Sequence, residues 1–502
     1  MSGRLAFIGF MGSGKTTAAR TAAAALNVRA VDADDEIEAR AGKSIPTIFS
    51  DDGEAAFRAS EEQVALDLLA REEVVSLGGG AVGSARVREA LRDRTVVWMD
   101  VDPDTAWERA HGTDRPLARD RAAFERLHGE REPIYANLAD LTVPSGRSAR
   151  IADAIAALQG VPPGARVLWA ASASGDYPAY VGSGLLGWWP EGIGGRRFIV
   201  TDGKVARLYG GAIASAGSVR VMPGEQSKTI AHAEIVWTEL VRAGMTRADV
   251  VVALGGGVVG DLAGFCAATY QRGVRYVQVP TTLVAQVDSA YGGKTGVDLP
   301  EAKNYVGAYH QPSAVISDTD ALKTLPSEEL AAGYAEVLKT ALIAGGWLWE
   351  RVRGGAEPAE PDLIAGCART KLRIVARDER DSGLRQTLNL GHTVAHALEA
   401  VTGYARYRHG EAVGLGLLAA LRLSGQSELR SEVGALLAAK GLPTTLDGAD
   451  PPAIVDATRT DKKRVGEGPV PFVLLAGPGA PKTGCAVPER ELLAAVRELA
   501  GE

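Results

Sequence analysis

Three histidines and one glutamate in the second half of the chain have the residue types and spacing to bind a metal ion. His392 and His396 are four positions apart in LNLGHTVAHA, so we expect them on one face of a helix. His409 follows in RYRHGEAVG, and Glu336 stands in the helical stretch GYAEVLKT. Two histidines and one carboxylate leave a coordination position open, which suits a catalytic zinc. The alternative is a group of hydrogen-bonded histidines packed between helices.

A phosphate-binding loop is encoded near the start of the chain. GFMGSGKT at residues 9–16 matches GxxxxGK[ST] and stands between the strand LAFIGF and a helix. Backbone N–H groups at such a helix start can bind phosphate oxygens, Lys15 can reach the transferred phosphate, and Thr16 can bind Mg²⁺. The alternative is a glycine-rich turn with a structural role. The expected nucleotide contacts are Gly12, Ser13, Gly14, Lys15, Thr16 and Thr17.

Carboxylates and arginines follow this loop. Asp32 and Asp34 end the second strand on one face of it, where they can hold Mg²⁺ and accept a proton from an alcohol. The alternative is a helix N-cap, because more acidic residues follow. Several arginines beside a phosphate loop indicate an anionic acceptor and charge to neutralise, although any one alone could be a surface charge. The candidates are Arg58, Arg115 and Arg131, with Gly78 to Gly80 in SLGGG.

A second glycine-rich segment, DVVVALGGGVVGD, runs from residue 249 to residue 261. Gly255, Gly257 and Gly260 satisfy GxGxxG between a strand and a helix, but no acidic residue ends the next strand, VQVPTTL. A dinucleotide is therefore not expected to bind in the ordinary Rossmann manner. Polar contacts could come instead from earlier segments, through Asp202, Glu225 and Lys228.

Basic residues recur inside the glycine-rich and histidine-bearing motifs of this second region. In a chain that is acidic overall, this placement indicates a pocket for phosphate and carboxylate, although any single lysine could be merely solvated. The residues are Arg272, Lys294, Lys303, Lys339, Lys371, Arg385, Lys462 and Lys463.

Length, net charge, cysteine content and hydropathy narrow the range of possible functions further. The chain has 502 residues, so we expect two or three domains. Its net charge of -7 argues against nucleic-acid and anionic-membrane partners. Three scattered cysteines exclude a disulfide framework, and no apolar stretch approaches the roughly 20 residues of a membrane span. MSGRLAFIGF has no signal-peptide cleavage site, so we expect the cytoplasm.

Strand-like runs alternate with alanine-rich helices, which predicts an α/β fold with parallel sheets. We expect a P-loop kinase domain over residues 1–160 and a Pro/Gly linker at 161–165. A Rossmann-like nucleotide-binding lobe should cover 166–321, and a mostly helical metal- and substrate-binding lobe should cover 322–502.

The motifs of the first 160 residues, DxD, GExxFR, GGG, RPL and RxPxY in this order, resemble shikimate kinase. The resemblance implies ATP with Mg²⁺ as cofactor and a small carboxylated polyol as acceptor. It implies Asp32 on Mg²⁺, Asp34 on the substrate hydroxyls, and Arg115 on phosphates. Shikimate would be held by Arg58, Gly79, Gly80 and Arg131.

The motifs from about residue 166 onward resemble 3-dehydroquinate synthase: PGExSK, GGGVVGD, QRG, QVPTTL, GGKTG, AEVLK, LNLGHTxxHA, HGEAV and DKK. The resemblance implies NAD⁺ and a catalytic Zn²⁺ or Co²⁺ on Glu336, His392 and His409, with His396 near the substrate and Asp288 bridging zinc site and ring. Implied substrate contacts are Arg272, Lys294, Asn304, Lys339, Lys371, Arg385, Asn389 and Lys462 or Lys463. Implied NAD⁺ contacts are Asp202, Glu225, Lys228, Gly255, Gly256, Gly257, Val258, Asp261, Thr281, Thr282, Lys303, Asn304 and Thr324.

This resemblance implies cyclisation of a seven-carbon 2-keto sugar acid 7-phosphate with phosphate release, recycling of NAD⁺, and a homodimer. One departure is Asp381, where the family often carries Glu. Three alternatives stay open: a metal-dependent polyol dehydrogenase, a related sugar-phosphate cyclase, and a half that has become a scaffold. The presence of both complete residue sets argues against the scaffold. The two reactions are not consecutive, so fusion does not imply channelling.

Overall fold

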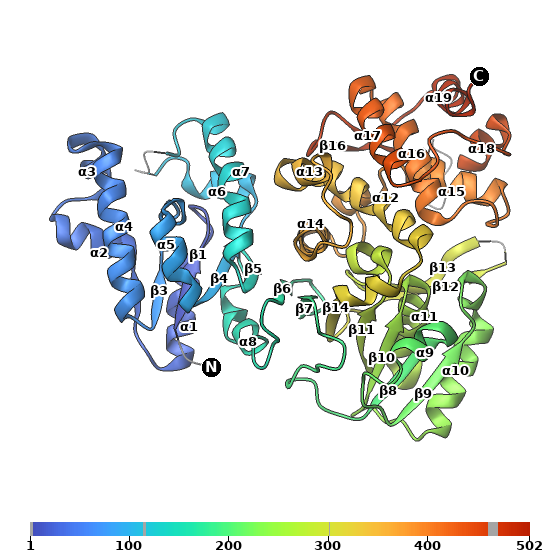
Figure 1. Cartoon of the computed structure of the whole chain (residues 1–502), viewed down its shortest axis with the longest axis horizontal. Coiled ribbons are helices and arrows are strands. Elements are labelled where there is room, and N and C mark those ends of the chain that lie inside the picture. Colours follow the sequence, from blue (N-terminus) through green and yellow to red (C-terminus); the bar gives the residue numbers. More distant parts are fainter. Residues whose placement is uncertain (1–3, 114–116, 301, 460–469) are drawn as a thin grey trace. The chain divides into compact units, whose positions relative to one another are not determined.

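The structure is a computed structural model, and it describes residues 4–113, 117–300, 302–459 and 470–502. Arg115, Lys462 and Lys463, for which roles were predicted, lie outside the described residues. The chain divides into two compact units. Unit 1 comprises Met1–Ala171, Pro178–Tyr180 and Trp188–Ile193, and unit 2 comprises Ser172–Tyr177, Val181–Gly187 and Gly194–Glu502. Each unit is shown in Figure 1 and is described separately below.

Unit 1 is built on a parallel sheet with strand order β2-β3-β1-β4-β5-β6 (Figure 1). Its central strand β1 pairs with β3 on one side and β4 on the other, and it is fully buried because every residue is apolar. This burial on both faces is typical of parallel strands covered by helices. The strands are β1 (Leu5–Ile8), β2 (Ala30–Asp32), β3 (Val74–Ser76), β4 (Thr95–Asp100), β5 (Leu141–Pro144) and β6 (Arg166–Ala170).

Strand β6 begins beyond the expected linker at 161–165 and pairs with β5 through Leu141↔Val167 and Thr142↔Leu168. It therefore extends the sheet of unit 1. The next strand, β7 (Tyr177–Gly182), has residues in both units. The limits of the domains as separate folding units remain a prediction.

Local sequence signals explain where the helices of unit 1 begin. Asp32, Ser44, Asp102 and Asp120 each cap a helix by accepting a hydrogen bond from a backbone N–H two or three residues later. The core packs aromatic and branched side chains of these helices against the sheet. The helices are α1 (Lys15–Leu26), α2 (Ala33–Ala41), α3 (Ile45–Asp51), α4 (Gly53–Arg71), α5 (Ala85–Ala90), α6 (Pro103–Ala110), α7 (Arg121–Leu138) and α8 (Ile151–Ala156).

Unit 2 contains a second parallel arrangement, with strand order β14-β11-β10-β8-β9. The connection from β8 through α9 leads to one edge, whereas that from β10 through α11 leads toward the other. The carboxyl ends of β8 and β10 therefore form a topological switch point, the place where such sheets bind ligands. The strands are β8 (Arg197–Asp202), β9 (Gly217–Val221), β10 (Val250–Gly255), β11 (Arg275–Pro280) and β14 (Ala314–Asp318), with helices α9 (Gly203–Tyr209), α10 (Ile230–Arg242) and α11 (Gly257–Thr269).

An antiparallel hairpin of β12 (Lys294–Leu299) and β13 (Ala302–Tyr309) precedes β14. From residue 327 onward the unit is mostly helical, with one short hairpin of β15 (Phe472–Leu475) and β16 (Pro481–Cys485) among the described residues. The helices are α12 (Ser327–Ala344), α13 (Gly346–Arg353), α14 (Pro361–Arg377), α15 (His392–Val401), α16 (His409–Leu423), α17 (Ser427–Ala439), α18 (Pro451–Thr458) and α19 (Glu489–Ala500). The predicted fold class, two α/β regions followed by a helical lobe, is confirmed.

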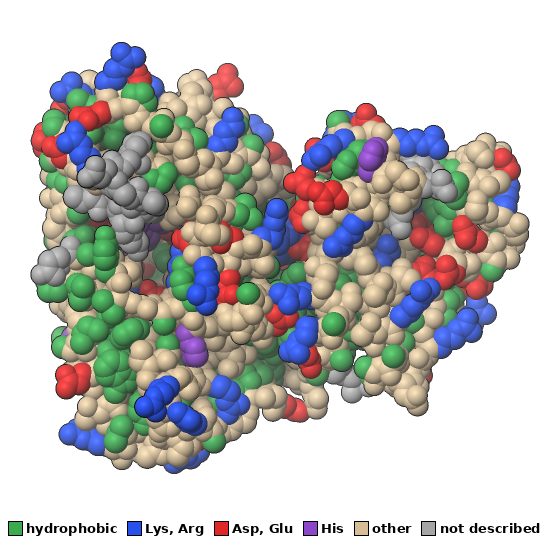
Figure 2. Space-filling view, turned by 180° about the vertical axis from the view of Figure 1, so that it is seen from behind, with side chains coloured by type: hydrophobic (Ala, Val, Ile, Leu, Met, Phe, Trp, Pro, Cys, Tyr) green, Lys and Arg blue, Asp and Glu red, His purple; other side chains and the backbone are tan. Residues whose placement is uncertain are grey.

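The distribution of charge on the surface and the hydropathy of the helices agree with the net charge and hydropathy of the sequence. On the face shown in Figure 2, basic and acidic side chains are interspersed rather than separated into large areas of one sign. Among the described residues, none of the helices is both long enough and apolar enough to cross a membrane.

Candidate active sites

The phosphate loop of unit 1 has the backbone shape that its glycines predict. Gly9 has φ +148°, and a Cβ there would lie 2.6 Å from the carbonyl oxygen of Met99 on the neighbouring strand β4. Gly12 and Gly14 have φ of +77° and +83°. Gly14 precedes α1, and no side chain caps this helix, so its first N–H groups are available to an anion. Lys15 is buried at the first helical position.

Thr16 and Asp32 meet at the carboxyl end of the sheet. The Thr16 hydroxyl donates to Oδ2 of Asp32 at 2.6 Å, and the other oxygen, Oδ1, accepts from the backbone N–H of Asp34 at 2.9 Å. Asp32 therefore caps α2, as in the alternative interpretation, and also faces the residue expected to bind Mg²⁺. A hydroxyl and a carboxylate beside a phosphate loop are suitable oxygen ligands for that ion.

A polar cluster lies next to this loop, where Arg58 of α4 meets the loop after β3. A Cβ on Gly78 would lie 2.4 Å from Oε1 of Glu61 and 3.0 Å from Oδ1 of Asp34. A Cβ on Gly80 would overlap the Arg58 guanidinium. These glycines are therefore required so that the side chains can approach the loop, and the structure brings Asp34, Arg58 and the glycines together.

Glu61 is a member of this cluster that the sequence analysis missed. It is 2% exposed, and one of its oxygens accepts from Nη1 of Arg58 at 2.6 Å. Burial raises the pKa of Glu61, and the nearby guanidinium of Arg58 only partly offsets the effect. The signal that could have revealed it is the spacing: Glu61 follows Arg58 by three residues, one turn of the same helix.

Helix α7 closes the other side of the cluster. The guanidinium of Arg131 lies over the ring of Phe10, with its carbon 5.8 Å from the ring centroid. Tyr135, one turn later, donates to the carbonyl oxygen of Gly79 at 2.6 Å. Burial raises the pKa of Tyr135, and Arg131 opposes this with a smaller lowering effect. Arg131 therefore faces the same loop as Arg58.

In unit 2, Glu336, His392 and His409 come from three different helices and converge. One ligand atom from each lies within 4.8 Å of the others, which is the separation that a single bound ion needs. Oε1 of Glu336 lies 3.5 Å from Nε2 of His392 and 3.2 Å from Nε2 of His409. His396 stands nearby, with its ring 5.3 Å from that of His392. Three neighbouring ligands of this chemistry suit Zn²⁺ or Co²⁺, as predicted.

The partners of the imidazoles assign the nitrogen that faces the ion site. Nδ1 of His392 lies 3.2 Å from the carbonyl oxygen of Leu390, so Nε2 is directed to Glu336. Nδ1 of His409 lies 3.5 Å from the carboxylate of Glu399, a buried residue that the sequence analysis missed. Desolvation at the cavity wall lowers the pKa of His409, but the carboxylates of Glu336 and Glu399 outweigh it and raise the pKa to about 10.

Two buried lysines surround Asp288 beside this cluster. Lys371 donates to Oδ1 of Asp288 at 2.5 Å, and Lys339 lies 3.4 Å from Oδ2 and 2.5 Å from Glu336. Burial acts to raise the pKa of Asp288, but Lys339 and Lys371 outweigh it and hold the pKa well below its usual range. Burial lowers the pKa of Lys371, which Asp288 only partly restores. The structure thus joins the metal cluster to a basic pocket.

A cavity of about 830 Å³ opens beside these residues and extends to the switch point of the sheet. His396, His409 and Asp288 line one part of it. The following predicted cofactor residues also line it: Asp202, Glu225, Lys228, Gly256, Gly257, Val258, Asp261, Thr281, Thr282, Lys303, Asn304 and Thr324. The lining also includes residues that the sequence analysis did not select, among them Tyr209, Met222, Ser289, Glu399 and Tyr404.

The glycine segment after β10 needs its glycines for close packing rather than for positive φ. A Cβ on Gly256 would lie 2.9 Å from Cγ2 of Thr282, and one on Gly257 would lie 2.9 Å from Oγ of Ser289. Helix α11 starts here with no side-chain cap, and its first residues line the cavity. A helix start of this kind can bind a pyrophosphate.

Several predicted residues stand outside the cavity lining. Arg272 is exposed at the end of the 3-10 helix Tyr270–Arg272, with φ +66°. Lys294 pairs with Asp381, which has φ +62°. Arg385 is buried and donates to the carbonyl oxygens of Gly292 and Glu379. The other predicted residues outside the lining are Gly255, Lys339, Lys371, Asn389, Glu336 and His392. Four of these belong to the adjoining cluster: Lys339, Lys371, Glu336 and His392. All these substrate and cofactor roles remain predictions.

Comparison with known proteins identifies both halves. The family model of the 3-dehydroquinate synthase N-terminal region matches residues 218–332, and that of its C-terminal region matches residues 333–464. The shikimate kinase model matches residues 11–159. The 3-dehydroquinate synthase of Symbiobacterium thermophilum is 45% identical over 333 residues, which are 60% of this chain and 92% of that protein.

Two solved structures are also similar. The 2-epi-5-epi-valiolone synthase from Streptomyces hygroscopicus subsp. jinggangensis, with NAD⁺ and Zn²⁺ bound, is 27% identical with a TM-score of 0.59 and covers 65% of this chain and 97% of that chain. Shikimate kinase from Acinetobacter baumannii, in complex with shikimate, is 33% identical with a TM-score of 0.30 and covers 31% of this chain and 91% of that chain. The chain therefore belongs to the 3-dehydroquinate synthase family and carries a shikimate kinase domain before its synthase region.

Proposed function

We propose that this chain is a bifunctional enzyme of the shikimate pathway. Its kinase half transfers a phosphoryl group from ATP to the 3-hydroxyl of shikimate. Its synthase half converts 3-deoxy-D-arabino-heptulosonate 7-phosphate to 3-dehydroquinate with release of phosphate. The observation that carries the proposal is the convergence of Glu336, His392 and His409 beside a cavity that ends at a helix start suited to a pyrophosphate.

In the kinase half, one set of residues binds the nucleotide on one side of the transferred phosphoryl group, and a second set binds the acceptor on the other side. The loop backbone and Lys15 hold the nucleotide phosphates, and Thr16 with Asp32 would hold Mg²⁺. That ion, when bound, neutralises charge on the phosphates. Asp34 orients the acceptor hydroxyl and takes its proton, while Arg58 and Arg131 bind the shikimate carboxylate. Arg115, outside the described residues, is proposed to contact the phosphates.

In the synthase half, the donor set fits a divalent ion and the cavity fits a dinucleotide. Two imidazoles and a carboxylate would hold the ion, and the N-terminus of α11 with Asp202 and Glu225 would hold NAD⁺. When bound, NAD⁺ would supply hydride transfer and the metal ion would polarise a ring hydroxyl. Lys339 and Lys371 would supply positive charge to substrate anions and developing oxyanions from beside the cavity, and Asp288, which lines the cavity, pairs with both lysines.

The remaining proposed roles complete the substrate pocket. Lys294, Asn304, Arg385 and Asn389 would contact the substrate, together with Arg272 and either Lys462 or Lys463. His396 lines the cavity, which supports a role in proton exchange with the substrate phosphate or hydroxyls. We also propose that the synthase half forms a homodimer and that the enzyme acts in the cytoplasm on small phosphorylated metabolites.

The central test is a stoichiometry measurement on the purified full chain with the heptulosonate phosphate. We expect one phosphate released per 3-dehydroquinate formed, with no net rise in NADH absorbance. A steady rise in NADH would contradict the proposal and favour a polyol dehydrogenase. Preferential turnover of sedoheptulose 7-phosphate would instead favour a related sugar-phosphate cyclase.

A further inference from the structure

Glu399 connects a metal-ligand histidine to the dinucleotide part of the cavity. It lies seven residues after His392 on α15, two helical turns along the same face, and it is 5% exposed. One carboxylate oxygen lies 3.5 Å from Nδ1 of His409, the nitrogen opposite the one that faces Glu336. The other oxygen lies 3.6 Å from Nζ of Lys303.

Lys303 itself has contacts that hold it at this position. Its ammonium lies 3.7 Å from the carboxylate of Glu225, a proposed NAD⁺ contact, and 4.2 Å from the centroid of the Tyr404 ring. Tyr404 has φ +57°, and its backbone N–H donates to the carbonyl oxygen of Glu399 at 2.8 Å. The backbone of Glu399 is therefore held by this hydrogen bond, and its carboxylate lies beside Lys303.

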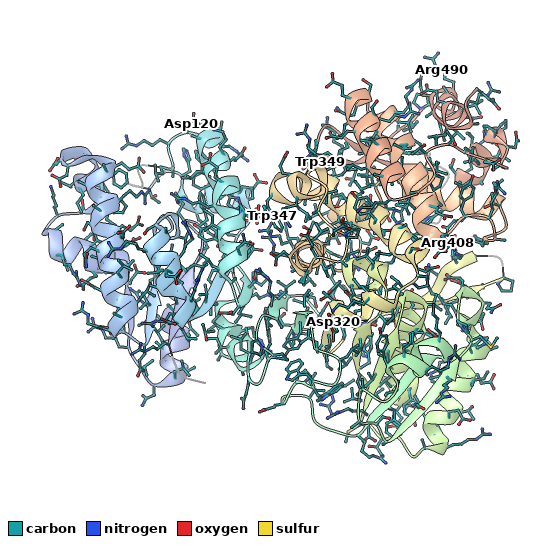
Figure 3. All side chains as sticks on the ribbon, viewed as in Figure 1. Asp120, Asp320, Trp347, Trp349, Arg408 and Arg490 are labelled. Carbon is teal, nitrogen blue, oxygen red and sulfur yellow. The ribbon has the colours of Figure 1, made fainter. Side chains whose placement is uncertain are left out.

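His409 occupies a more open position than His392, the other histidine of the metal cluster. His409 is the first residue of α16, directly after Arg408, which is labelled in Figure 3. Its side chain is 39% exposed, whereas that of His392 is 10% exposed and faces a backbone carbonyl. A half-exposed imidazole at a helix start needs a partner on its second nitrogen if its ring is to keep one orientation.

We propose that Glu399 is a positioning residue that orients His409 toward the metal, and that Lys303 is its counterion. The inference rests on the metal site of the proposed function. When Nε2 of His409 binds the ion, Nδ1 carries the proton, and Glu399 is the acceptor that faces it. A carboxylate in this position fixes the ring and increases the basicity of the ligand.

The test is a titration of the metal-free full chain with Co²⁺ alone, measured by chelator competition and by the visible absorption of the bound ion. Glu399→Ala is expected to weaken Co²⁺ binding on the order of 10- to 100-fold and to change the absorption spectrum. Glu399→Gln should lie between it and the native chain, because an amide oxygen can still accept from Nδ1. Glu411→Gln, which alters a carboxylate two residues from His409 on α16, is the matched control and should bind like the native chain.

The outcomes separate the inference from the proposed function. Failure of the native chain to bind Co²⁺, or no loss of binding in His392→Ala, would contradict the metal site itself. Loss of binding in His392→Ala with native affinity and spectrum in Glu399→Gln and Glu399→Ala would overturn only the role of Glu399. Lys303→Met distinguishes between the two partners of the Glu399 carboxylate. A loss of Co²⁺ affinity as large as that in Glu399→Ala would mean that Glu399 acts by pairing with Lys303 rather than by orienting His409. If Glu399→Ala does not fold, Glu399→Gln decides.

Discussion

Asp288 accepts two hydrogen bonds from the ammonium group of Lys371, one through Oδ1 at 2.5 Å and one through its backbone carbonyl oxygen at 2.7 Å. Nζ of Lys339 lies 3.4 Å from the other carboxylate oxygen of Asp288, Oδ2. The carboxylate is therefore a close counterion of Lys371 and shares Lys339 with Glu336, so its removal should affect both stability and catalysis.

Asp288→Asn is expected to destabilise the synthase half by about 3–5 kcal/mol, because it leaves buried ammonium charge without a full counterion. Glu239→Gln removes one partner of the exposed pair with Arg242 and should cost less than about 1 kcal/mol. Thermal melting of the two variants, followed with synthase activity, measures the difference. Equal melting temperatures would show that Lys339 and Lys371 are not held by Asp288.

Gly80→Ala should weaken shikimate binding, because the new methyl group would overlap the guanidinium of Arg58. Loss of a charge-assisted hydrogen bond costs about 1.5–3 kcal/mol, or roughly a 10- to 100-fold rise in KM for shikimate. Gly83→Ala is the control, since no heavy atom lies within 4 Å of its Cβ. A normal KM in Gly80→Ala, with synthase activity unchanged, would argue against Arg58 as the carboxylate contact.

Removal of tightly bound metal by dipicolinate should abolish synthase activity and leave kinase activity unchanged once Mg²⁺ is supplied in excess. Added Zn²⁺ or Co²⁺ should restore the synthase in the native chain but not in His392→Ala. Lys15→Ala should show the converse, with kinase activity lost and synthase activity retained. Loss of both activities in either variant would contradict two independent sites.

Asp378→Asn tests the turn that leads into Arg385. The Asp378 carboxylate accepts from the backbone N–H groups of Ser382, Gly383 and Arg385 at 2.8–2.9 Å. Burial acts to raise the pKa of Asp378, but these hydrogen bonds outweigh it and lower the pKa well below its usual value. Its stabilising effect is therefore present above the unfolded-state pKa of about 3.9 and is lost as the pH falls below it.

We expect Asp378→Asn to reduce the stability of the synthase half by about 2 kcal/mol at neutral pH. The difference from the native chain should shrink as the pH falls from about 5 toward about 3 and should not change between about pH 6 and 8. Urea unfolding of the synthase half at several pH values measures it. A difference that grows on acidification would mean that the carboxylate is not stabilised by this turn.

The sequence predicted the residues that stand inside motifs and missed those that act through a fold contact. The phosphate loop and the group Glu336, His392 and His409 could be predicted because their spacing and types carry the chemistry. Glu61 and Glu399 were missed. The spacing of Glu61 from Arg58 on α4 is also that of an ordinary surface ion pair, and only the packing of α4 against Gly78 and Gly80 places it in the site. Glu399 is an ordinary acidic residue until α15 packs beside His409.

Pairings between distant segments were equally inaccessible. The contact of Lys294 with Asp381 joins a hairpin to a turn 87 positions away, and no periodicity encodes it. The parallel sheets could be predicted from apolar runs, whereas the order of their strands depends on packing that these runs do not specify. Arg385 illustrates a further limit, because a predicted substrate contact is also bound to two backbone carbonyls.

The pairing of β6 with β5 bears on any attempt to separate the two halves genetically. A fragment that stops at the Pro/Gly segment would leave the backbone donors and acceptors of Leu141 and Thr142 along a newly bare sheet edge, which is prone to self-association. A kinase fragment that continues through Ala171 retains that strand. A synthase fragment that starts at Ser172 would retain every residue of the metal cluster and of the cavity described above.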